Sequence, residues 1–380
     1  MRLKEITISA NTGLDAIKRA PIVDEYTGLK CLRIQDMSQN KEYDDWGNTQ
    51  TTENDYKKFK LRIDDVLVAR TGATVGVSYL VRKNLNAVFN NGSIRLRLSD
   101  NVDARFVYYV FQTKSFKQYI DNVSCVATQP NLRVETLLKF NIPDYDINIQ
   151  RRIASILFAY DKLIENNNRR IRLLERMVEN LYKEWFVRFR FHGHDKVEFE
   201  DGLPKGWEIM RFKDVIIEQP KSKVQVGNVE GNSGQYPFYT SGANILQYNQ
   251  YLVDGENILL NTGGIADVKY SIGKIHYSTD TWCIKGIDGY TLFLYLYLKG
   301  ILPEINASYF EGAALKHLKK ASFKKKKLLV PPTTLIKEFN LRVSVFYREI
   351  FWLKQNTQLL SRQRDLLLPR LMSGKLEVNA

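Results

Sequence analysis

The sequence predicts two tandem α/β (α+β) domains separated by a long antiparallel two-helix coiled coil. Three observations support this fold class. The chain has 380 residues, more than one hydrophobic core usually serves. Two long segments carry apolar residues at alternating steps of three and four, as paired helices do. Similar motifs recur in the same order in both halves, which predicts an internal repeat with a pseudo-two-fold axis.

The internal repeat is visible in three pairs of motifs. The halves open alike, with RLKEITI at 2–8 and MRFKDVI at 210–216. An acidic turn, a buried strand and a Thr-Gly loop follow, in IDDVLVARTGATVG at 63–76 and DGENILLNTGGIADV at 254–268. An apolar strand, a proline and a helix start come last, in LLKFNIPDYDINIQRRI at 137–153 and KKLLVPPTTLIKEFNL at 326–341. The chain is therefore predicted to be a tandem duplication in which a globular domain precedes each long helix.

Two heptad-patterned seams define the long helices. The first consists of Ile149, Ile153, Ile156, Tyr160, Leu163, Asn167, Ile171, Leu174, Val178, Leu181 and Trp185, and the second of Phe339, Val343, Phe346, Ile350, Leu353, Thr357, Leu360, Arg364, Leu367 and Leu371. Consecutive steps of four around Asn167 predict a stutter, and Pro369 is expected to kink or end the second helix. The alternative is two unrelated amphipathic helices that pack on separate cores.

The expected organisation follows from these segments. Two long helices in one chain bury their seams most economically against each other, and roughly 40 helical residues at ~1.5 Å each make a rod of about 60 Å. We expect a globular domain at 1–146, a long helix at 147–190, a linker at 191–208, a second globular domain at 209–333, a second long helix at 334–374 and a tail at 375–380.

Charge and composition narrow the class of partner. A net charge of +14 attracts polyanions, so nucleic acid, the ribosome and an anionic membrane all fit. Residues 315–337 are strongly basic and contain no acidic residue, which favours a phosphate-binding groove over a merely solvated face. Since no apolar run is long enough to span a bilayer and no signal sequence is evident, we expect a cytoplasmic protein with no membrane partner. The widely spaced Cys31, Cys125 and Cys283 are predicted to be buried small hydrophobic residues.

Enzymatic signatures were sought without success. A phosphate-binding loop is missing, because Gly273 and Lys274 are followed by isoleucine, and the Pro-Pro of LVPPTT lacks the flanking residues of an amino-methyltransferase loop. The segment His192-Gly-His194-Asp195 has two readings, a metal site or a structural joint. A structural zinc site requires four ligands and no cysteine lies nearby, so we interpret the segment as a joint with solvent-facing histidines. The chain itself is therefore expected to be non-catalytic and to bind no metal.

Loops that follow the predicted strands carry side chains suited to DNA. Arginine can contact phosphate or guanine, asparagine amides can read adenine, and glycine allows close backbone approach. The candidate residues are Arg33, Gln35, Arg70, Thr71, Gly72, Ala73, Thr74, Asn90, Asn91, Gln129 and Asn131 in the first half, and Tyr239, Thr240, Ser241, Asn261, Thr262, Gly263, Lys269, Lys316 and Lys319 in the second. The alternative for each loop is a turn satisfied by its own backbone. Since the loops differ between the halves, each half is expected to read a different sequence.

Four segments carry a family resemblance that spans essentially the whole chain. Residues 182–215, YKEWFVRFRFHGHDKVEFEDGLPKGWEIMRFKDV, are similar to the junction between the central helices and the second target-recognition domain of type I restriction-modification specificity subunits. LLLPRLMSGKLEV at 366–378 resembles the end of the second helical region of that family. VLVARTGATVG at 66–76 resembles its recognition-domain loop, and NIPDYDINIQRRIASIL at 141–157 its entry into the first helix.

The resemblance implies a non-catalytic subunit that reads double-stranded DNA. Two recognition domains would each bind one half of a split, asymmetric target, and the helices would set the spacer between the halves. Two modification (methyltransferase) subunits would dock around the helices and hold S-adenosylmethionine, while this chain would bind no cofactor. Restriction subunits that use ATP and Mg²⁺ would turn the complex into a nuclease. The loop LLNTGGIADV lacks an arginine equivalent to Arg70, so that contact is not carried over.

A second function remains open from the residues alone. The chain fits a stand-alone coiled-coil protein whose basic surface tethers it to nucleic acid without base preference. This reading predicts no methyltransferase partner, so a neighbouring gene for a modification subunit discriminates between the two.

Overall fold

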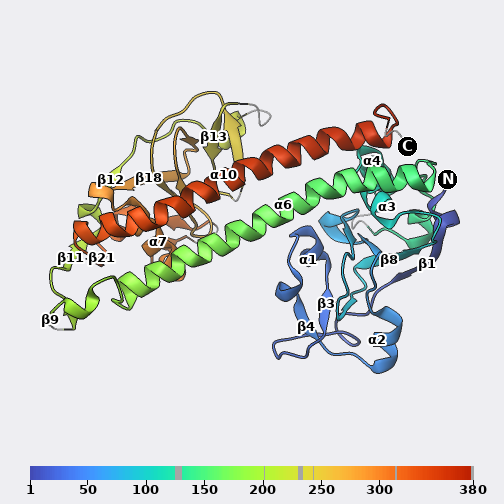
Figure 1. Ribbon diagram of the computed structural model, residues 1–380, viewed down its shortest axis with the longest axis horizontal. Coiled ribbons are helices and arrows are strands. Elements are labelled where there is room, and N and C mark those ends of the chain that lie inside the picture. The colour runs from blue at the N-terminus through green and yellow to red at the C-terminus, as the bar shows by residue number, and fades with distance from the viewer. Residues whose placement is uncertain (125–130, 201, 230–233, 243, 313–314, 378–380) are drawn as a thin grey trace. The chain divides into compact units, whose positions relative to one another are not determined.

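The computed structural model describes residues 1–377 apart from 125–130, 201, 230–233, 243 and 313–314 (Figure 1). Two structural units divide the chain. The first unit comprises residues 1–166 and 356–380, and the second unit comprises residues 167–355. Each unit contains one mixed helix and sheet domain together with part of each of two long helices, α6 (Ile147–Tyr182) and α10 (Thr333–Met372). The predicted tandem α/β fold class is therefore confirmed.

The first unit is built on two four-stranded sheets. The first sheet is antiparallel with the order β1-β8-β5-β6, and the second has the order β2-β4-β3-β7 with β3 and β7 parallel. The strands are β1 (Thr7–Thr12), β2 (Ile22–Val23), β3 (Lys30–Leu32), β4 (Gly47–Thr49), β5 (Val66–Ala69), β6 (Ser78–Leu80), β7 (Ala87–Phe89) and β8 (Ser93–Leu98). The helices are η1 (Leu3–Ile6), α1 (Ile34–Ser38), η2 (Tyr43–Asp45), α2 (Glu53–Phe59), η3 (Gly72–Thr74), α3 (Ala104–Val110), α4 (Lys114–Ser124) and α5 (Val134–Leu137).

Among its described residues, the second unit has a four-stranded sheet, a three-stranded sheet and three two-stranded pairs. The larger sheet is antiparallel with the order β12-β18-β15-β16, and the smaller has the order β14-β13-β17 with β13 and β17 parallel. The strands are β9 (Phe199–Glu200), β10 (Leu203–Pro204), β11 (Glu208–Arg211), β12 (Ile216–Glu218), β13 (Tyr236–Tyr239), β14 (Ile245–Tyr248), β15 (Asn257–Asn261), β16 (Val268–Ser271), β17 (His276–Tyr277), β18 (Thr281–Gly286), β19 (Phe310–Glu311), β20 (His317–Leu318) and β21 (Lys327–Val330). The short helices are η5 (His194–Lys196), η6 (Phe212–Asp214), η7 (Val226–Asn228), η8 (Ile287–Gly289), α7 (Thr291–Gly300), α8 (Leu302–Ser308) and α9 (Lys320–Phe323).

The two units repeat one topology, which confirms the internal repeat. The sheet β1-β8-β5-β6 corresponds strand by strand to β12-β18-β15-β16, and β4-β3-β7 corresponds to β14-β13-β17 with the same strand directions. Val66 of β5 lies opposite Leu96 of β8, and Ile258 of β15 lies opposite Ile284 of β18. This register makes Val66 equivalent to Ile258 and therefore Arg70 equivalent to Thr262.

Each domain is closed by its own opening segment. The backbone N–H of Leu3 donates to the carbonyl of Phe140 at 2.9 Å, and the N–H of Phe212 donates to the carbonyl of Lys326 at 2.8 Å. Leu3 and Phe212 are both fully buried. An apolar side chain thus anchors each 3₁₀ turn in its core while the backbone joins the segment that leads into a long helix.

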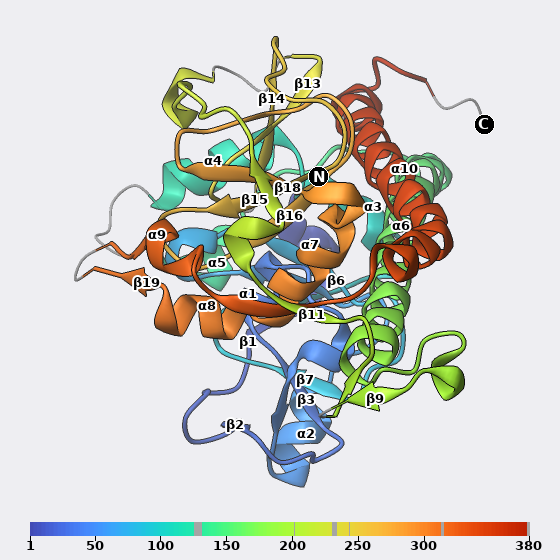
Figure 2. The ribbon, with the colours of Figure 1, turned by 90° about the vertical axis from the view of Figure 1, so that its left-hand side faces the viewer.

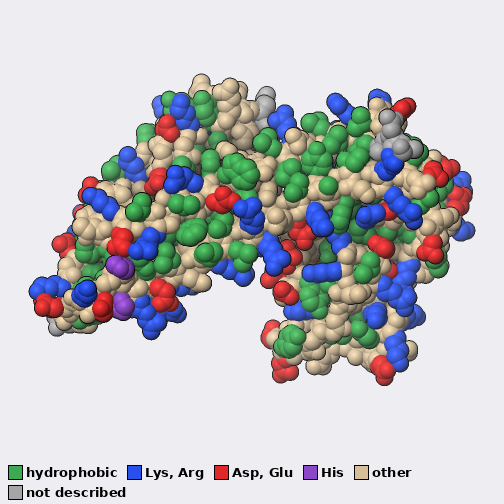
Figure 3. All heavy atoms as spheres, in the orientation of Figure 1, with side chains coloured by type: hydrophobic (Ala, Val, Ile, Leu, Met, Phe, Trp, Pro, Cys, Tyr) green, Lys and Arg blue, Asp and Glu red, His purple; other side chains and the backbone are tan. Residues whose placement is uncertain are grey.

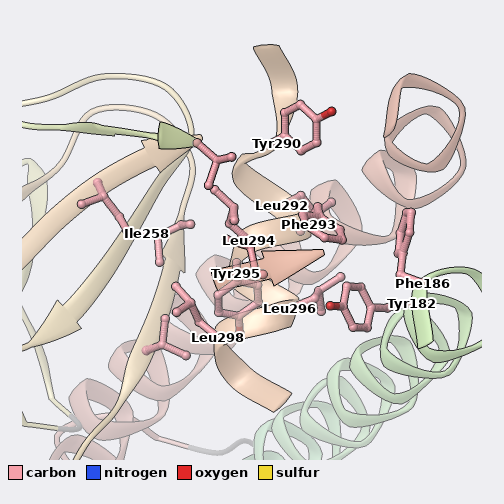
Figure 4. Close-up of a cluster of buried hydrophobic side chains, with 14 of the residues drawn as sticks. Tyr182, Phe186, Ile258, Tyr290, Leu292, Phe293, Leu294, Tyr295, Leu296 and Leu298 are labelled. Carbon is pink, nitrogen blue, oxygen red and sulfur yellow. The ribbon is translucent and has the colours of Figure 1, made fainter. Parts of the chain in front are cut away.

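In the core of the second unit, α7 packs against β15, β16 and β18 of the larger sheet and also contacts α8 (Figure 2). The run of leucine and aromatic residues at 292–298 is buried here apart from the half-buried Tyr297, because the helix is covered on more than one side. Phe293 contacts the rings of Tyr182 and Phe186, with centroid separations of 5.8 and 5.0 Å (Figure 4). The longest apolar run of the sequence therefore forms a core helix, and no helix among the described residues is long and apolar enough to cross a membrane.

The two long helices are α6 (Ile147–Tyr182) and α10 (Thr333–Met372). A π-helical turn, η4 (Lys183–Val187), extends α6, so helical structure ends before residue 190. The left-handed backbone of Phe189, with φ of 57°, turns the chain away there. Pro369 lies within the last turn of α10, which ends three residues later, in agreement with the predicted termination.

The helices run antiparallel in the second unit. Trp185 of η4 packs on Phe339 of α10 at 5.7 Å between ring centroids, whereas Lys354 near the other end of this stretch bonds Glu175 at 3.0 Å. The partner number on α10 rises as the number on α6 falls, which defines the antiparallel direction. Val178, Val343 and Leu353 are fully buried within the same core.

In the first unit, a buried carboxylate joins the helices to the globular domain. Asp161 of α6 accepts hydrogen bonds from Arg364 of α10 at 2.7 Å, from Arg82 at 3.1 Å and from the Tyr109 hydroxyl at 2.7 Å. Burial and the neighbouring carboxylate raise the pKa of the Tyr109 phenol, so it stays protonated and donates. Although burial opposes its charge, hydrogen bonds to Asp161 and Asp365 hold the pKa of Arg364 above its ordinary value. Three donors compensate the desolvation of one carboxylate.

This cluster corrects part of the first predicted seam. Leu157 and Asp161 are buried, whereas Ile156 and Tyr160 are only half-buried and Leu163 is 51% exposed. Ile153 is buried as predicted, but at Leu157 and Asp161 the buried positions lie one residue after the predicted Ile156 and Tyr160. There are two physical reasons. A search for apolar residues at heptad spacing cannot find a buried aspartate, and α6 packs against the globular domain as well as against α10. Asn167 itself is buried, as expected.

The predicted linker 191–208 is folded in the structure. Phe191 is buried, and the ring of Trp207 packs on Phe189 at 5.1 Å and on Phe186 at 6.1 Å. β9 and β10 form a short hairpin, and β11 begins already at Glu208, where it pairs with β21. Aromatic residues of the joint therefore belong to the core around η4.

Cys31 and Cys283 are buried free thiols, as the sequence predicts, while Cys125 lies outside the described residues. Burial raises the pKa of both thiols to about 12. A thiol that remains protonated is a poor nucleophile and metal ligand, so these two cysteines serve as packing residues.

We predict that Asp161→Asn destabilises the first unit by about 3 kcal/mol, because two guanidinium groups lose their shared anion in a largely buried place. Glu165→Gln is the matched control, since Glu165 faces the same Arg82 at 3.6 Å but is 58% exposed. It should cost less than about 1 kcal/mol. Chemical denaturation of the purified variants measures both, and equal effects would contradict a special role for the buried carboxylate.

Candidate nucleic-acid interface

The first loop cluster is formed by residues 70–72, which follow β5, and residues 131–132, which precede α5. Thr71 pairs with Asn131 in an antiparallel bridge, and the N–H of Leu132 donates to the Arg70 carbonyl at 2.8 Å. The Arg70 guanidinium donates to the Asn131 side-chain oxygen at 2.9 Å and to the Leu132 carbonyl at 3.3 Å. An exposed amide and a half-buried cation are thereby held side by side.

A second loop lies against the first loop cluster. The N–H of Arg70 donates to the Gly92 carbonyl at 2.8 Å. A Cβ atom at Gly92 would lie 2.5 Å from the end of the Ile34 side chain, so that side chain would have to shift if a larger residue stood where this loop meets α1. Arg33 and Gln35 flank Ile34, and Arg33 bonds Asp36 at 3.0 Å while Gln35 is exposed. The structure thus places Arg33, Gln35, Arg70, Asn90, Asn91 and Asn131 around one part of the first unit.

The remaining candidates of the first unit build or extend this surface. Gly72 has φ of 75° and open space around it, which suits a close approach of backbone to a ligand. Thr71 and Thr74 are half-buried and Ala73 is exposed in η3. Asn91 is exposed, whereas Asn90 is half-buried with a buried side-chain oxygen that has no partner among the described residues. Gln129 lies outside the described residues.

In the second unit, Asn261 and Lys269 act inside the protein. Asn261 is buried; its amide donates to the carbonyls of Gly263 and Ile265, and its oxygen accepts from the Asp267 N–H at 2.6 Å. The Lys269 ammonium donates to the carbonyls of Thr240 and Gly242 at 2.9 and 2.6 Å. These two candidate side chains hold the loops 240–242 and 262–267 in place and are occupied in doing so.

The candidates at 239–241 are also mostly internal. Tyr239 and Thr240 are buried, and Ser241 is half-buried. The Thr240 hydroxyl donates to the Asn244 carbonyl at 2.9 Å and accepts from the Gly242 N–H at 3.2 Å. Burial raises the pKa of the Tyr239 phenol to about 12. This short segment forms a self-bonded turn, the alternative that its Thr and Gly residues suggested.

The second loop cluster surrounds Thr262 and Gly263. Gly263 pairs with His317 in an antiparallel bridge, the N–H of Leu318 donates to the Thr262 carbonyl at 3.0 Å, and the N–H of Gly264 donates to the Lys316 carbonyl at 2.9 Å. Lys316 and His317 are exposed. Sequence reasoning missed His317, although the repeat carries a signal for it: Asn-Leu-Arg at 131–133 matches His-Leu-Lys at 317–319.

Several lysines of the basic segment 315–337 are paired with carboxylates. Lys324 bonds Glu218, Lys326 bonds Glu304 and Lys319 bonds Glu311. Although partial burial of Glu218 opposes ionisation, hydrogen bonds from Lys324 and the Trp282 indole hold its pKa below the ordinary value. Lys316, Lys325 and Lys327 are exposed. Basic side chains are interspersed with acidic ones over the visible face (Figure 3), so the positive charge is not gathered in one block there.

The two histidines of the joint have separate surroundings. The His194 Nδ1 lies 2.9 Å from the Phe191 carbonyl, and the His192 Nδ1 lies 3.9 Å from a Glu338 carboxylate oxygen. Both residues are exposed. Within the described residues, no group of three or more histidine, cysteine or acidic side chains is arranged to hold a metal ion.

Two copies of one framework therefore carry loop clusters with different side chains, which defines a class of internally duplicated two-domain proteins. The family model for the type I restriction modification DNA specificity domain matches residues 4–176 and 204–339. The chain therefore belongs to this family of type I restriction-modification specificity subunits, the non-catalytic DNA-recognising component of such systems.

Relatives and a solved structure agree with this assignment. The MjaIX type I restriction enzyme specificity subunit of Methanocaldococcus jannaschii is 25% identical over 361 residues, which cover 87% of this chain and 83% of that protein. The EcoDI specificity subunit of Escherichia coli is 26% identical over 178 residues, or 46% of this chain and 39% of that protein. The crystal structure of a type I restriction-modification S subunit from M. genitalium aligns over 98% of this chain and 95% of that chain, with a TM-score of 0.63 and 18% identity, and shows the same fold.

We predict that Lys316→Ala makes the binding of a mixed-sequence duplex less sensitive to salt. The negative slope of log affinity against log salt concentration should become smaller in magnitude by about one, because an exposed lysine that meets a phosphate releases about one counterion. Lys319→Ala is the matched control, since Lys319 is already paired with Glu311 and should change the slope less. Fluorescence anisotropy of the purified chain over a salt series measures both slopes. A larger effect at Lys319 would place the phosphate contact elsewhere.

Proposed function

We propose that this chain is the sequence-reading and scaffolding subunit of a DNA adenine methyltransferase complex. Each unit reads one half of an asymmetric, two-part target, and the long helices set the number of base pairs between the halves. The observation that carries the proposal is the repeat itself: one framework occurs twice, with Arg70 and Asn131 in one copy and Thr262 and His317 at the equivalent places in the other. A duplicated framework with different loop chemistry suits two different half-sites.

The helices support the spacer part of the proposal. α6 passes from the first unit into the second between Asn166 and Asn167, and α10 returns between Gln355 and Asn356. Both crossings occur in uninterrupted helix. A helix holds a defined rise per residue, so its length is a direct means of setting a distance.

Exposed apolar residues on the helices support the scaffolding part. In the second unit, α10 exposes Leu341, Val345 and Trp352, and α6 exposes Leu173 and Met177 at a spacing of four. Hydrophobic side chains are visible at the surface along α10 (Figure 3). An exposed tryptophan on a helix face is typical of a protein contact, because tryptophan is enriched among residues that dominate binding energy.

In the first unit, the same two helices also expose apolar side chains. Leu359 and Leu366 of α10 are exposed one heptad apart, and Leu163 of α6 is also exposed. We assign these faces to the modification subunits, two per chain as the duplication suggests. S-adenosylmethionine belongs to those subunits, and ATP and Mg²⁺ to restriction subunits where a system has them.

We predict that co-expression with its modification subunit produces one methylated motif made of two specified parts separated by unspecified bases. Inserting one heptad after Asn167 and one after Gln355 should change the number of unspecified bases and leave both specified parts unaltered, because only the helices are lengthened. Sequencing that detects methylated adenine in a host lacking other methyltransferases measures this. Absence of any motif would support the tethering function instead, and altered specified bases would contradict the spacer role.

We predict that Trp352→Ala weakens association with the modification subunit by at least about 2 kcal/mol, roughly thirty-fold in Kd, and leaves folding intact, because Trp352 is 56% exposed. Leu353→Ala is the matched control on the neighbouring, fully buried position, where truncation should lower the unfolding midpoint. Analytical ultracentrifugation and thermal unfolding separate the two effects. Unchanged association of Trp352→Ala would remove this face from the proposed interface.

A further inference from the structure

The two loop clusters make equivalent backbone hydrogen bonds in the two units. In the first unit, the residue after β5 donates its N–H to the loop before β8: Arg70 to the Gly92 carbonyl at 2.8 Å. In the second unit, Thr262 donates to the Asp280 carbonyl at 2.9 Å. The residue next along the chain forms the isolated bridge, to Asn131 in one unit and to His317 in the other.

The alignment continues on the opposite strand. Leu132 donates to the Arg70 carbonyl at 2.8 Å, and Leu318 donates to the Thr262 carbonyl at 3.0 Å. Both leucines are buried, and a short helix follows each of them, α5 in the first unit and α9 in the second. His317 therefore occupies the backbone position of Asn131.

Equivalent backbone positions carry different side chains. In the first unit, Arg70 reaches across the bridge to the amide of Asn131. In the second unit, the Thr262 hydroxyl turns back and donates to the Asp280 carbonyl at 3.0 Å. No long side chain crosses the bridge from Thr262, so the second unit leaves His317 as its projecting polar group.

The surroundings of His317 leave its ring available. A methyl group placed on Gly263 would lie 3.6 Å from the ring atoms Cε1 and Nδ1, which is ordinary van der Waals contact, so the ring lies beside the Gly263 backbone. The residue is exposed, and its ring nitrogens have no hydrogen-bond partner in the part of the chain that the structure describes. The neighbouring Lys319 is drawn to Glu311 on the adjacent strand, whereas Lys316 is exposed.

We propose that His317 is a base-reading residue of the second unit, at the place that Asn131 occupies in the first unit. A neutral imidazole has one donor and one acceptor nitrogen, so it can bond an acceptor or a donor on a base edge in the major groove of duplex DNA. This inference rests on the proposed function, because it names a residue that distinguishes the two half-sites.

The test is the methylated motif written by single variants in the assembled complex. His317→Ala should lower the preference for the original base at one position of one half-site roughly ten-fold or more. Asn131→Ala, its counterpart by the repeat, should act on the other half-site only. His317→Asn places the side chain of the first unit in the second and should change the preferred base at the same position as His317→Ala.

The outcomes are distinguishable. If the wild-type chain writes no two-part motif, the proposed function fails, whatever the variants do. If the wild type writes one and all His317 variants write the same motif at the same rate, His317 is not a base reader. Uniform loss of methylation by His317→Asn, with an unchanged unfolding midpoint and an assembled complex, would also overturn the inference, because it indicates a general role in binding. Changes in the same half-site for Asn131→Ala and His317→Ala would overturn it as well.

Discussion

Each structural unit depends on one buried central strand, β5 in the first unit and β15 in the second. Both strands are hydrogen-bonded on two sides, by β8 and β6 or by β18 and β16, and their side chains are buried. A buried strand must satisfy every backbone group, so its register cannot slip without exposing core residues. The last residue of the strand, Ala69 or Asn261, therefore has a fixed position. The position of the first residues of the following loop is fixed as a consequence.

The candidate interface follows from this constraint. Because the strand ends alike in both units, the residues after it meet the same partner segment in both: 131–132 in the first unit and 317–318 in the second. Backbone bonds hold these loops, which leaves side chains at the bridge free to differ. The framework does not need particular side chains at these positions, so a polar side chain can be exchanged there at little cost in stability.

The helices combine apolar packing with a few buried polar groups. Val343 and Leu353 contribute apolar burial in the second unit, while Asp161 gathers two arginines and a tyrosine in the first. An apolar seam tolerates small slips along the helix, whereas a carboxylate with three directed donors accepts one position only. The Asp161 cluster thus positions α6, α10 and the globular domain of the first unit together, and the helices keep exposed leucine, methionine and tryptophan side chains on their outer faces.

By itself, the sequence determined the repeat, both long helices, the end of α10 near Pro369 and the loops after the central strands, because these depend on local periodicity and turn chemistry. Tertiary structure decided which polar residues face inward. Asn261, Lys269 and Thr240 have the composition of DNA-contacting residues, yet their partners are carbonyls brought close only by folding. Two further features depend on contacts between residues far apart in the chain, which a local sequence pattern does not reveal. They are the burial of Asp161 in the first seam and the position of His317 opposite Gly263.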